Sequence, residues 1–164
     1  MGLAAAAAVV AILAVGSVAN AVVFADASAP LTLTISGVEV GQTRGSVSSV
    51  SGQNLAYTSG YQRDRSVNGN ATYTTINTDY STLIYDDLGN LIGSSSFTNQ
   101  ARVRTSGSQS AAWTREPDTT KSISKSGLNL SKTAYTARVA VCEDRGLLNP
   151  DVCKVKLVPL TLVN

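Results

Sequence analysis

The chain has 164 residues, which is enough for one domain of ordinary size. Its 13 basic and 11 acidic side chains leave a net charge of +2, too mild for a concentrated nucleic-acid-binding surface. Because the sequence contains no histidine, Ser-His-Asp and Cys-His catalytic arrangements and histidine metal sites are excluded.

The N-terminal segment, residues 3–25, is uncharged and almost entirely apolar. It is long enough to span a bilayer, but alanine dominates it. Small residues also have the spacing that signal peptidase recognises, in Val23-Phe24-Ala25 and Ala25-Asp26-Ala27. We therefore predict a signal peptide over residues 1–27, a single domain over residues 28–164 and a secreted bacterial protein. The alternative is a protein anchored in the membrane by residues 3–25.

Beyond the leader, short runs of two-residue alternation replace any sustained helical period. The first predicted strand covers residues 31–35, and it either completes this domain or is donated to another subunit, with completion the favoured expectation. The Ser/Gly-rich stretch at residues 41–53 follows, and we predict a connection or a weak edge strand there.

Two hairpins are predicted in the middle of the chain. The first joins residues 61–67 to residues 70–76 through Asn68-Gly69, a pair that accepts positive φ at both turn centres. The second has arms at residues 79–86 and 90–98, with Gly89 in the left-handed position of a three-residue turn.

The remaining predicted strands follow at short intervals. The strongest has the sequence AYTARVAVC at residues 134–142, and the last contains Pro159, which indicates an edge position or a bulge. Eight or nine strands separated by turns predict an all-β antiparallel β-sandwich. The other predicted strands cover residues 101–105, 109–114, 121–124 and 154–162.

The two cysteines, Cys142 and Cys153, stand eleven positions apart. In an oxidising compartment we expect them to pair, which would stabilise the fold by roughly 3 kcal/mol in the chain-entropy model. A disulfide across a loop is favoured over a metal site because no histidine is present to complete one. We expect neither a metal nor a cofactor.

One stretch, SGLNLSKTAYTARVAVC at residues 126–142, resembles a region of fibronectin type III and related immunoglobulin-like domains. In that family a leucine precedes a turn, and a tyrosine follows at the start of an alternating strand. The resemblance implies an immunoglobulin-like β-sandwich in which Tyr135 bonds back to the connecting turn and Trp113 lies between the sheets. It implies nothing about activity.

Paired carboxylates are the catalytic candidates that remain, but each pair lies in a predicted turn, where acidic residues act as solvated turn formers. Serines and threonines have no visible activating base. We therefore predict that the protein is not an enzyme. The carboxylate pairs are Asp86 with Asp87, Glu116 with Asp118, and Glu143 with Asp144.

Two pairs of arginines are the binding candidates. Arg63 and Arg65 alternate on one predicted strand and Arg102 and Arg104 on another, so each pair should share a face. If the two strands are neighbours, the four guanidinium groups would form a ladder suited to carboxylates of a partner. Tyr61 and Tyr73 are predicted to join that surface. The alternative is that these are ordinary solvent-facing residues.

Together these observations predict a secreted, non-enzymatic binding module or an adaptor subunit of a larger extracellular bacterial assembly. Its partner would be a protein with an acidic surface and not a nucleic acid, and membrane contact would require an uncleaved leader. One alternative is a small bacteriocin-like toxin, since lactococcin-type proteins are similar in size and in Ser/Thr/Tyr-rich texture. The other is an extracellular protease inhibitor that uses the loop between Cys142 and Cys153.

Overall fold

The computed structural model describes residues 21–50, 54–66, 68–86, 88–122 and 130–161. Regular structure in these ranges is entirely β, and no helix in them could cross a membrane. Most of the predicted leader, residues 1–20, lies outside the described ranges. Its last part does not: Val22–Ala25 forms the strand β1.

The first sheet is built around the long strand β3, Val38–Val50. Strand β4, Asn54–Asp64, pairs with one edge of β3, while β1 and β2, Leu31–Ile35, pair with the other edge. The two short strands β7, Thr114–Arg115, and β8, Thr119–Ser122, pair with β4. All of these pairings are antiparallel.

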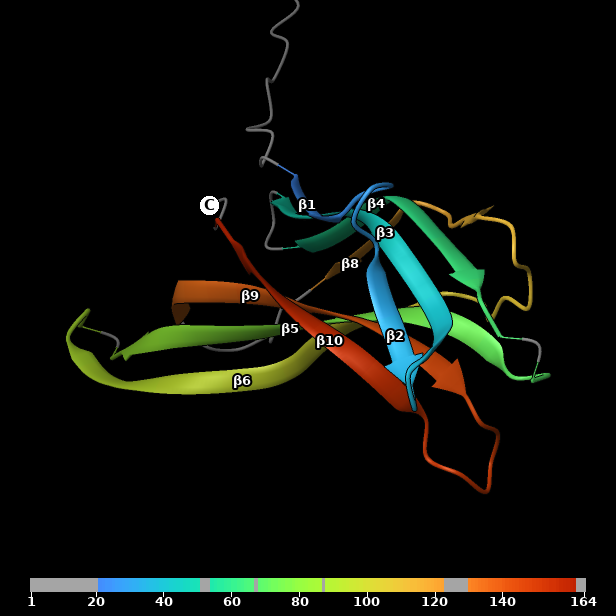
Figure 1. The fold of residues 1–164 in the computed structure, drawn as a ribbon. Coiled ribbons are helices and arrows are strands. Elements are labelled where there is room, and N and C mark those ends of the chain that lie inside the picture. The colour runs from blue at the N-terminus through green and yellow to red at the C-terminus, as the bar shows by residue number, and fades with distance from the viewer. Residues whose placement is uncertain (1–20, 51–53, 67, 87, 123–129, 162–164) are drawn as a thin grey trace, which may run out of the picture.

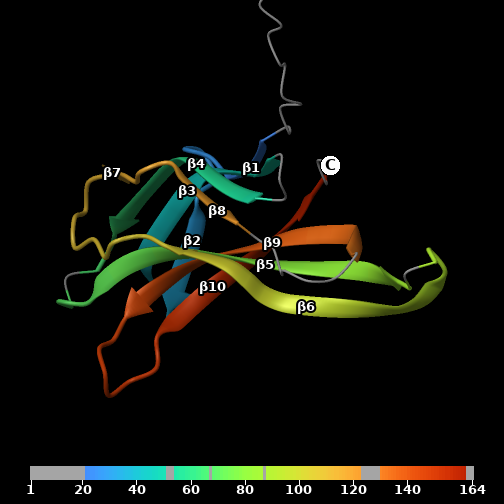
Figure 2. The ribbon, with the colours of Figure 1, turned by 180° about the vertical axis from the view of Figure 1, so that it is seen from behind.

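The second sheet has the order β10-β9-β5-β6 and is also antiparallel. Strands β5, Ala71–Tyr85, and β9, Leu130–Asp144, form its centre. Strands β6, Leu91–Arg104, and β10, Val152–Leu160, form its two edges. The hairpin of β5 and β6 and the beginning of β9 extend well past the first sheet (Figures 1 and 2).

The two sheets face each other, and one apolar cluster fills most of the space between them. Its largest members are Phe24 and Tyr57 of the first sheet and Ile76 and Tyr135 of the second. Towards the disulfide end a polar group lies beside a second, smaller apolar cluster of Leu33, Val40 and Val141. There the Thr74 hydroxyl contacts the Thr43 hydroxyl at 2.8 Å and the Gln62 side-chain oxygen at 3.3 Å, so side-chain hydrogen bonds join the layers.

Several expectations from the sequence are confirmed. The strand at residues 31–35 is β2, and it pairs within this chain, with β3. The second predicted hairpin is β5–β6, and Gly89 has the expected left-handed backbone, with a φ of 81°. Pro159 lies in an edge strand, because among the described strands β10 pairs with β9 alone.

Three expectations are wrong. Residues 41–50 of the Ser/Gly-rich stretch belong to β3, which is paired on both edges and is neither a loop nor an edge strand. The turn at Asn68-Gly69 does not close a hairpin, since β4 and β5 belong to different sheets and the turn is a crossover between them. Of the strand expected at residues 109–114, only Thr114 is in a named strand, β7.

The expected role of Tyr135 is tested only in part. Its side chain is buried in the core between the sheets. However, residues 130–134 directly before it belong to β9 and not to a turn, and its hydroxyl has no hydrogen-bond partner among the described residues.

Candidate functional site

The four arginines predicted to form one ladder are divided between the two sheets. Arg63 is in β4 and Arg65 follows it, whereas Arg102 and Arg104 are in β6. Because β4 and β6 belong to different sheets, the condition for a shared ladder is not met. Tyr61 and Arg63 fall into one cluster and Tyr73 and Arg104 into another, each built on cation–aromatic contacts. Arg65, which pairs with Glu39, and Arg102 belong to neither cluster.

The first cluster alternates arginine and aromatic side chains, and we call it the arginine–aromatic stack: Tyr61, Arg44, Trp113 and Arg63. The Arg44 guanidinium lies between two rings, 4.5 Å from the centroid of Tyr61 and 4.7 Å from that of Trp113. Trp113 also contacts the Arg63 guanidinium, at 4.4 Å from the ring centroid. All four side chains are half-buried.

Strand pairing explains how this stack is assembled. Arg44 of β3 is directly opposite Tyr61 of β4, and facing positions on antiparallel strands bring side chains together. Two positions further on, Gln42 is opposite Arg63, and its side-chain oxygen accepts a 2.7 Å hydrogen bond from Arg63 Nε. Strand β7 pairs with Tyr61 and Gln62, so Trp113, which directly precedes β7, lies on the same surface.

Trp113 is therefore not the core aromatic that the immunoglobulin-like resemblance implied. It is half-buried and lies outside the buried clusters between the sheets. Its ring is held by two cations and not by the opposite sheet. Sequence reasoning also missed Arg44, because it lies in the Ser/Gly-rich stretch that was not expected to be a central strand.

Ion pairing distinguishes the stack from the other basic residues. Within the described ranges, neither Arg44 nor Arg63 has a carboxylate within ion-pair distance, and Arg102 also has none. The other five arginines do form ion pairs: Arg65 with Glu39, Arg104 with Asp144, Arg115 with Asp118, Arg138 with Asp79, and Arg145 with Glu143. The stack thus holds two guanidinium groups whose charge is not compensated by a directly paired carboxylate.

The second cluster surrounds Tyr73 on the other sheet. The Arg104 guanidinium covers its ring at 3.8 Å from the centroid and pairs with Asp144 at 3.1 Å. The Tyr73 hydroxyl donates a hydrogen bond to Asp151, and the side chain is only 3 % exposed. Burial, reinforced by this bond, raises the pKa of Tyr73 to about 12. Tyr73 is therefore a packed residue beneath Arg104, and it offers little surface to a partner.

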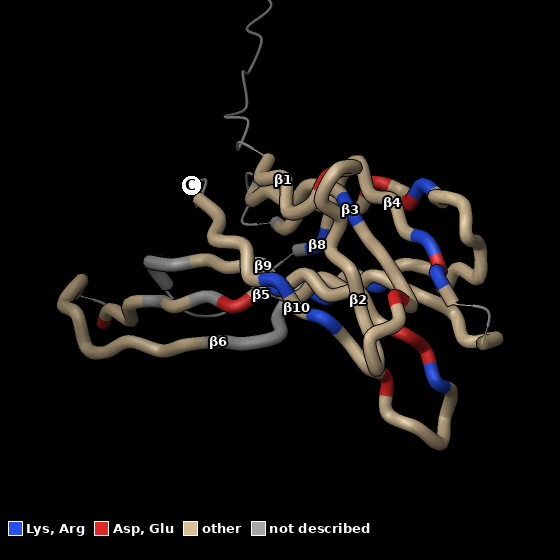
Figure 3. Tube along the Cα trace, viewed as in Figure 1, with Lys and Arg blue, Asp and Glu red and all other residues tan. Residues whose placement is uncertain are grey.

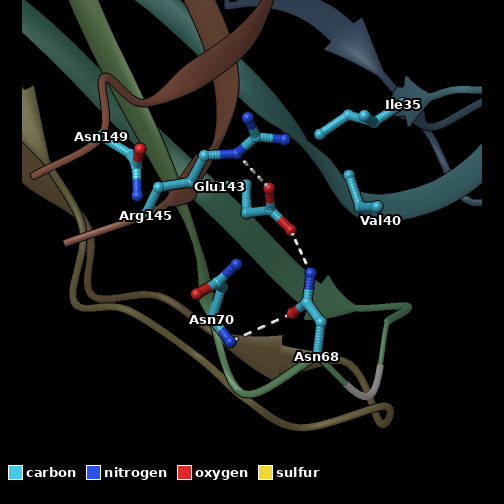
Figure 4. Close-up of a pocket in the computed structure, with 7 residues that line it drawn as sticks. All are labelled: Ile35, Val40, Asn68, Asn70, Glu143, Arg145 and Asn149. Atoms are coloured by element: carbon cyan, nitrogen blue, oxygen red, sulfur yellow. Dashed lines mark hydrogen bonds and ion pairs between the residues drawn. The ribbon is translucent and has the colours of Figure 1, made fainter.

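A hollow of about 400 Å³ lies beside the disulfide, which forms between Cys142 and Cys153 as predicted. Figure 4 shows Glu143 in this hollow, between Asn68 and Arg145. Burial alone would raise the pKa of Glu143, but hydrogen bonds from Arg145 and Asn68 outweigh it and lower the pKa. The carboxylate is thus held ionised inside the fold, where its hydrogen bond from Asn68 connects β9 to the crossover turn.

Glu143 and Glu116 are buried, at 2 % and 4 % exposed, so neither is the solvated turn former expected from the sequence, and burial raises the pKa of Glu116. Asp86 and Asp118 do have the contacts of turn formers. Asp86 caps its own turn by accepting hydrogen bonds from the backbone N–H groups of Leu88 and Asn90. Asp118 accepts one from the backbone N–H of Ser59 and pairs with Arg115. Asp87 lies outside the described ranges. Among the described residues, no group of three or more Cys, Asp or Glu side chains is placed to hold a metal ion.

Comparison with known proteins found no matching family model, no matching curated protein and no matching solved structure. The fold itself defines the class of protein: an all-β chain of two antiparallel sheets with one disulfide and an arginine–aromatic stack on the first sheet.

Proposed function

We propose that this chain is an exported, non-enzymatic binding module, or an adaptor subunit of a larger extracellular assembly, with an immunoglobulin-like β-sandwich fold. The arginine–aromatic stack is the surface that would hold an acidic partner protein. The observation that carries this proposal is the pair of guanidinium groups, Arg44 and Arg63, that lie against Trp113 and have no ion-paired carboxylate among the described residues.

Stacking leaves a guanidinium group suited to recognition. The flat faces of the two groups rest on aromatic rings. Arg44 Nε is buried and Arg63 Nε is bonded to Gln42, so a carboxylate of the partner would bind the terminal N–H groups. Because the rings already hold the side chain in place, less rotamer freedom is lost when a partner binds. Arg, Trp and Tyr are also the residue types that contribute most often to interface hot spots.

The position of the stack is consistent with a docking face. In Figure 3 the basic residues of β3 and β4 lie in the half of the molecule that carries most of the charge, away from the tip of the β5–β6 hairpin, where Asp86 caps the turn. Export is supported by the apolar leader sequence and by the disulfide, because disulfides persist in oxidising compartments.

The test compares two charge reversals on opposite sheets, Arg63→Glu and Arg104→Glu. Both arginines lie against an aromatic ring, so both variants lose a similar stacking contact. Partners are captured from the native culture medium with the wild-type protein, and the affinity of each variant for the captured partner is then measured. We expect Arg63→Glu to bind at least about tenfold more weakly, as for an interface hot spot, and Arg104→Glu to bind nearly as the wild type.

Thermal melting of both variants provides the control for folding. Unchanged binding by Arg63→Glu would remove the stack from consideration as the docking site. Loss of binding in Arg104→Glu alone would move the site to β6, where the sequence also placed candidate residues, Arg102 and Arg104.

A protease inhibitor is the second candidate function, because the loop between the two cysteines presents Leu147 and Leu148 fully to solvent. The loop is braced by Asp151, which accepts a hydrogen bond from the backbone N–H of Arg145. However, the two leucines form a turn and are not extended as a bound substrate would be. Titration against secreted proteases tests this function, and growth inhibition of neighbouring bacteria tests the toxin alternative.

A further inference from the structure

The short strand β1 is part of the folded domain, although it lies within the predicted leader. Val22 and Val23 pair with Val47 and Ser46 of β3. Phe24 is only 1 % exposed, and its ring lies against Tyr57 with 6.4 Å between the ring centroids. The space for this contact depends on Gly45, where an added Cβ would lie 3.3 Å from the Phe24 ring and 3.2 Å from the Tyr57 ring.

Two further contacts tie β1 to its surroundings. The Lys156 ammonium of β10 donates a hydrogen bond to the backbone oxygen of Phe24, which connects β1 to the second sheet. Asp26 follows β1 and accepts hydrogen bonds from the backbone N–H groups of Ser28 and Ala29, at 2.8 and 2.9 Å. These bonds shape the turn from β1 to β2.

The two cleavage positions expected from the sequence conflict with this arrangement. A cut after Ala25 or after Ala27 would remove Phe24 together with the whole of β1. The core would lose one of its largest fully buried side chains, and Tyr57 would lose its ring contact. A secreted domain that retained this core would need a processing site before residue 22.

The sequence supplies such a site directly before β1. Ala19-Asn20-Ala21 places small residues at the third and first positions before the bond between Ala21 and Val22, as signal peptidase requires. Ala21 is exposed and is followed at once by the first residue of β1. The recognition sequence thus ends where the folded domain begins.

We propose that signal peptidase hydrolyses the peptide bond between Ala21 and Val22, so that the mature protein begins with β1. Water adds across this bond, leaving a carboxylate on Ala21 and a new amino group on Val22. This inference rests on the export included in the proposed function. It differs from the boundary expected from the sequence by six residues, 22–27, which remain in the mature protein.

The test is export of the full chain, with its own leader, from a bacterial host, followed by N-terminal sequencing and intact mass of the exported protein. We expect Val22 as the first residue. A first residue of Asp26 or Ser28 would overturn the inference while leaving export intact. A secreted chain with an uncleaved leader would overturn the inference and leave export intact, whereas a chain retained in the cell with its leader would overturn both.

A matched pair of variants identifies the bond independently. Ala21→Leu and Ala27→Leu each place a large side chain just before one of the competing bonds, and both alanines are exposed, so neither change disturbs the core. We expect Ala21→Leu to reduce the yield of product beginning at Val22 at least tenfold, and Ala27→Leu to leave that yield unchanged. The opposite result would assign cleavage to the position after Ala27.

Discussion

At the residue scale, tyrosines with similar sequence surroundings have different roles. Tyr57 packs in the core against Phe24, Tyr61 is half-buried in the arginine–aromatic stack, and Tyr73 lies beneath Arg104. Burial raises the pKa of Tyr57 and of Tyr73. Whether a tyrosine side chain is buried or accessible depends on which face of the sheet it lies on and on which residues cover that face.

Tyr73 makes stability depend on alkaline pH. Because its folded pKa is raised to about 12, from an ordinary value of 10.0, the folded state favours the neutral phenol. The resulting stabilisation is complete below the unfolded pKa and is lost as the pH rises from 10 through about 12. We expect Tyr73→Phe to be less stable than the wild type at pH 7 by about 1 kcal/mol, through loss of the bond to Asp151.

Urea unfolding at several pH values between 7 and 12 measures this difference. The stability difference between the wild type and Tyr73→Phe should shrink towards pH 12. The wild type loses stabilisation as Tyr73 ionises, whereas phenylalanine has no proton to lose. A difference that stays constant over the whole range would show that ionisation of Tyr73 is not linked to unfolding.

At the element scale, turn chemistry is the most local determinant of this fold. The β5–β6 turn is closed by a 2.9 Å hydrogen bond from the Asp86 N–H to the Asn90 oxygen, and the Gly89 N–H donates to the Asp86 oxygen. These contacts join residues at most four positions apart, so the sequence reveals them. The pairing of β3 with β1, β2 and β4 involves distant segments, and its Ser/Gly-rich composition concealed it.

The left-handed backbone of Gly89 can be tested with a matched glycine. An added Cβ would meet no atom within 4 Å at Gly89 or at Gly93 of the adjoining strand, so packing is unaffected in both cases. Of these two glycines, Gly89 alone has a positive φ, of 81°. We expect Gly89→Ala to lower the free energy of unfolding by about 1–2 kcal/mol through backbone strain, and Gly93→Ala to lower it little or not at all. Equal effects in chemical denaturation would contradict this explanation.

At the scale of the whole molecule, two layers are held together by a large apolar cluster, and towards the disulfide end by a smaller apolar cluster and side-chain hydrogen bonds between the sheets. The disulfide joins directly paired residues of β9 and β10 at that end. It also closes the loop that carries Leu147 and Leu148 and that supplies Asp151 to Tyr73. The bond thus restrains both an edge strand and the loop beside the hollow that contains Glu143.

Removing the disulfide should destabilise the whole domain. The cysteines are separated by 11 positions, and loops of this size are worth roughly 3 kcal/mol in the chain-entropy model. We expect the double variant Cys142→Ala/Cys153→Ala to lose about 2–3 kcal/mol of unfolding free energy. Reduction of the wild type should produce a similar loss, which separates the covalent bond from the substituted side chains. A loss below about 0.5 kcal/mol in both experiments would contradict this role.

The binding candidates show how far prediction could reach. Arg63 and Tyr61 were identified from the sequence and lie in the arginine–aromatic stack, but their partners Arg44 and Trp113 were not. Arg44 was missed because its strand was not recognised, and Trp113 because the resemblance implied a core position. The division of the four arginines between two sheets was hidden by the crossover at Asn68-Gly69, whose residues also favour a hairpin turn.

The sequence by itself determined the all-β character, the β5–β6 hairpin, the edge position of Pro159 and the pairing of the cysteines. Each of these depends on residue types and on spacings within a short segment. Only the tertiary structure decided which sheet each strand joins, that β1 contributes Phe24 to the core, and that two arginines share the ring of Trp113. Those outcomes depend on packing between distant segments, where many strand orders satisfy the same local pattern and only one buries these particular side chains together.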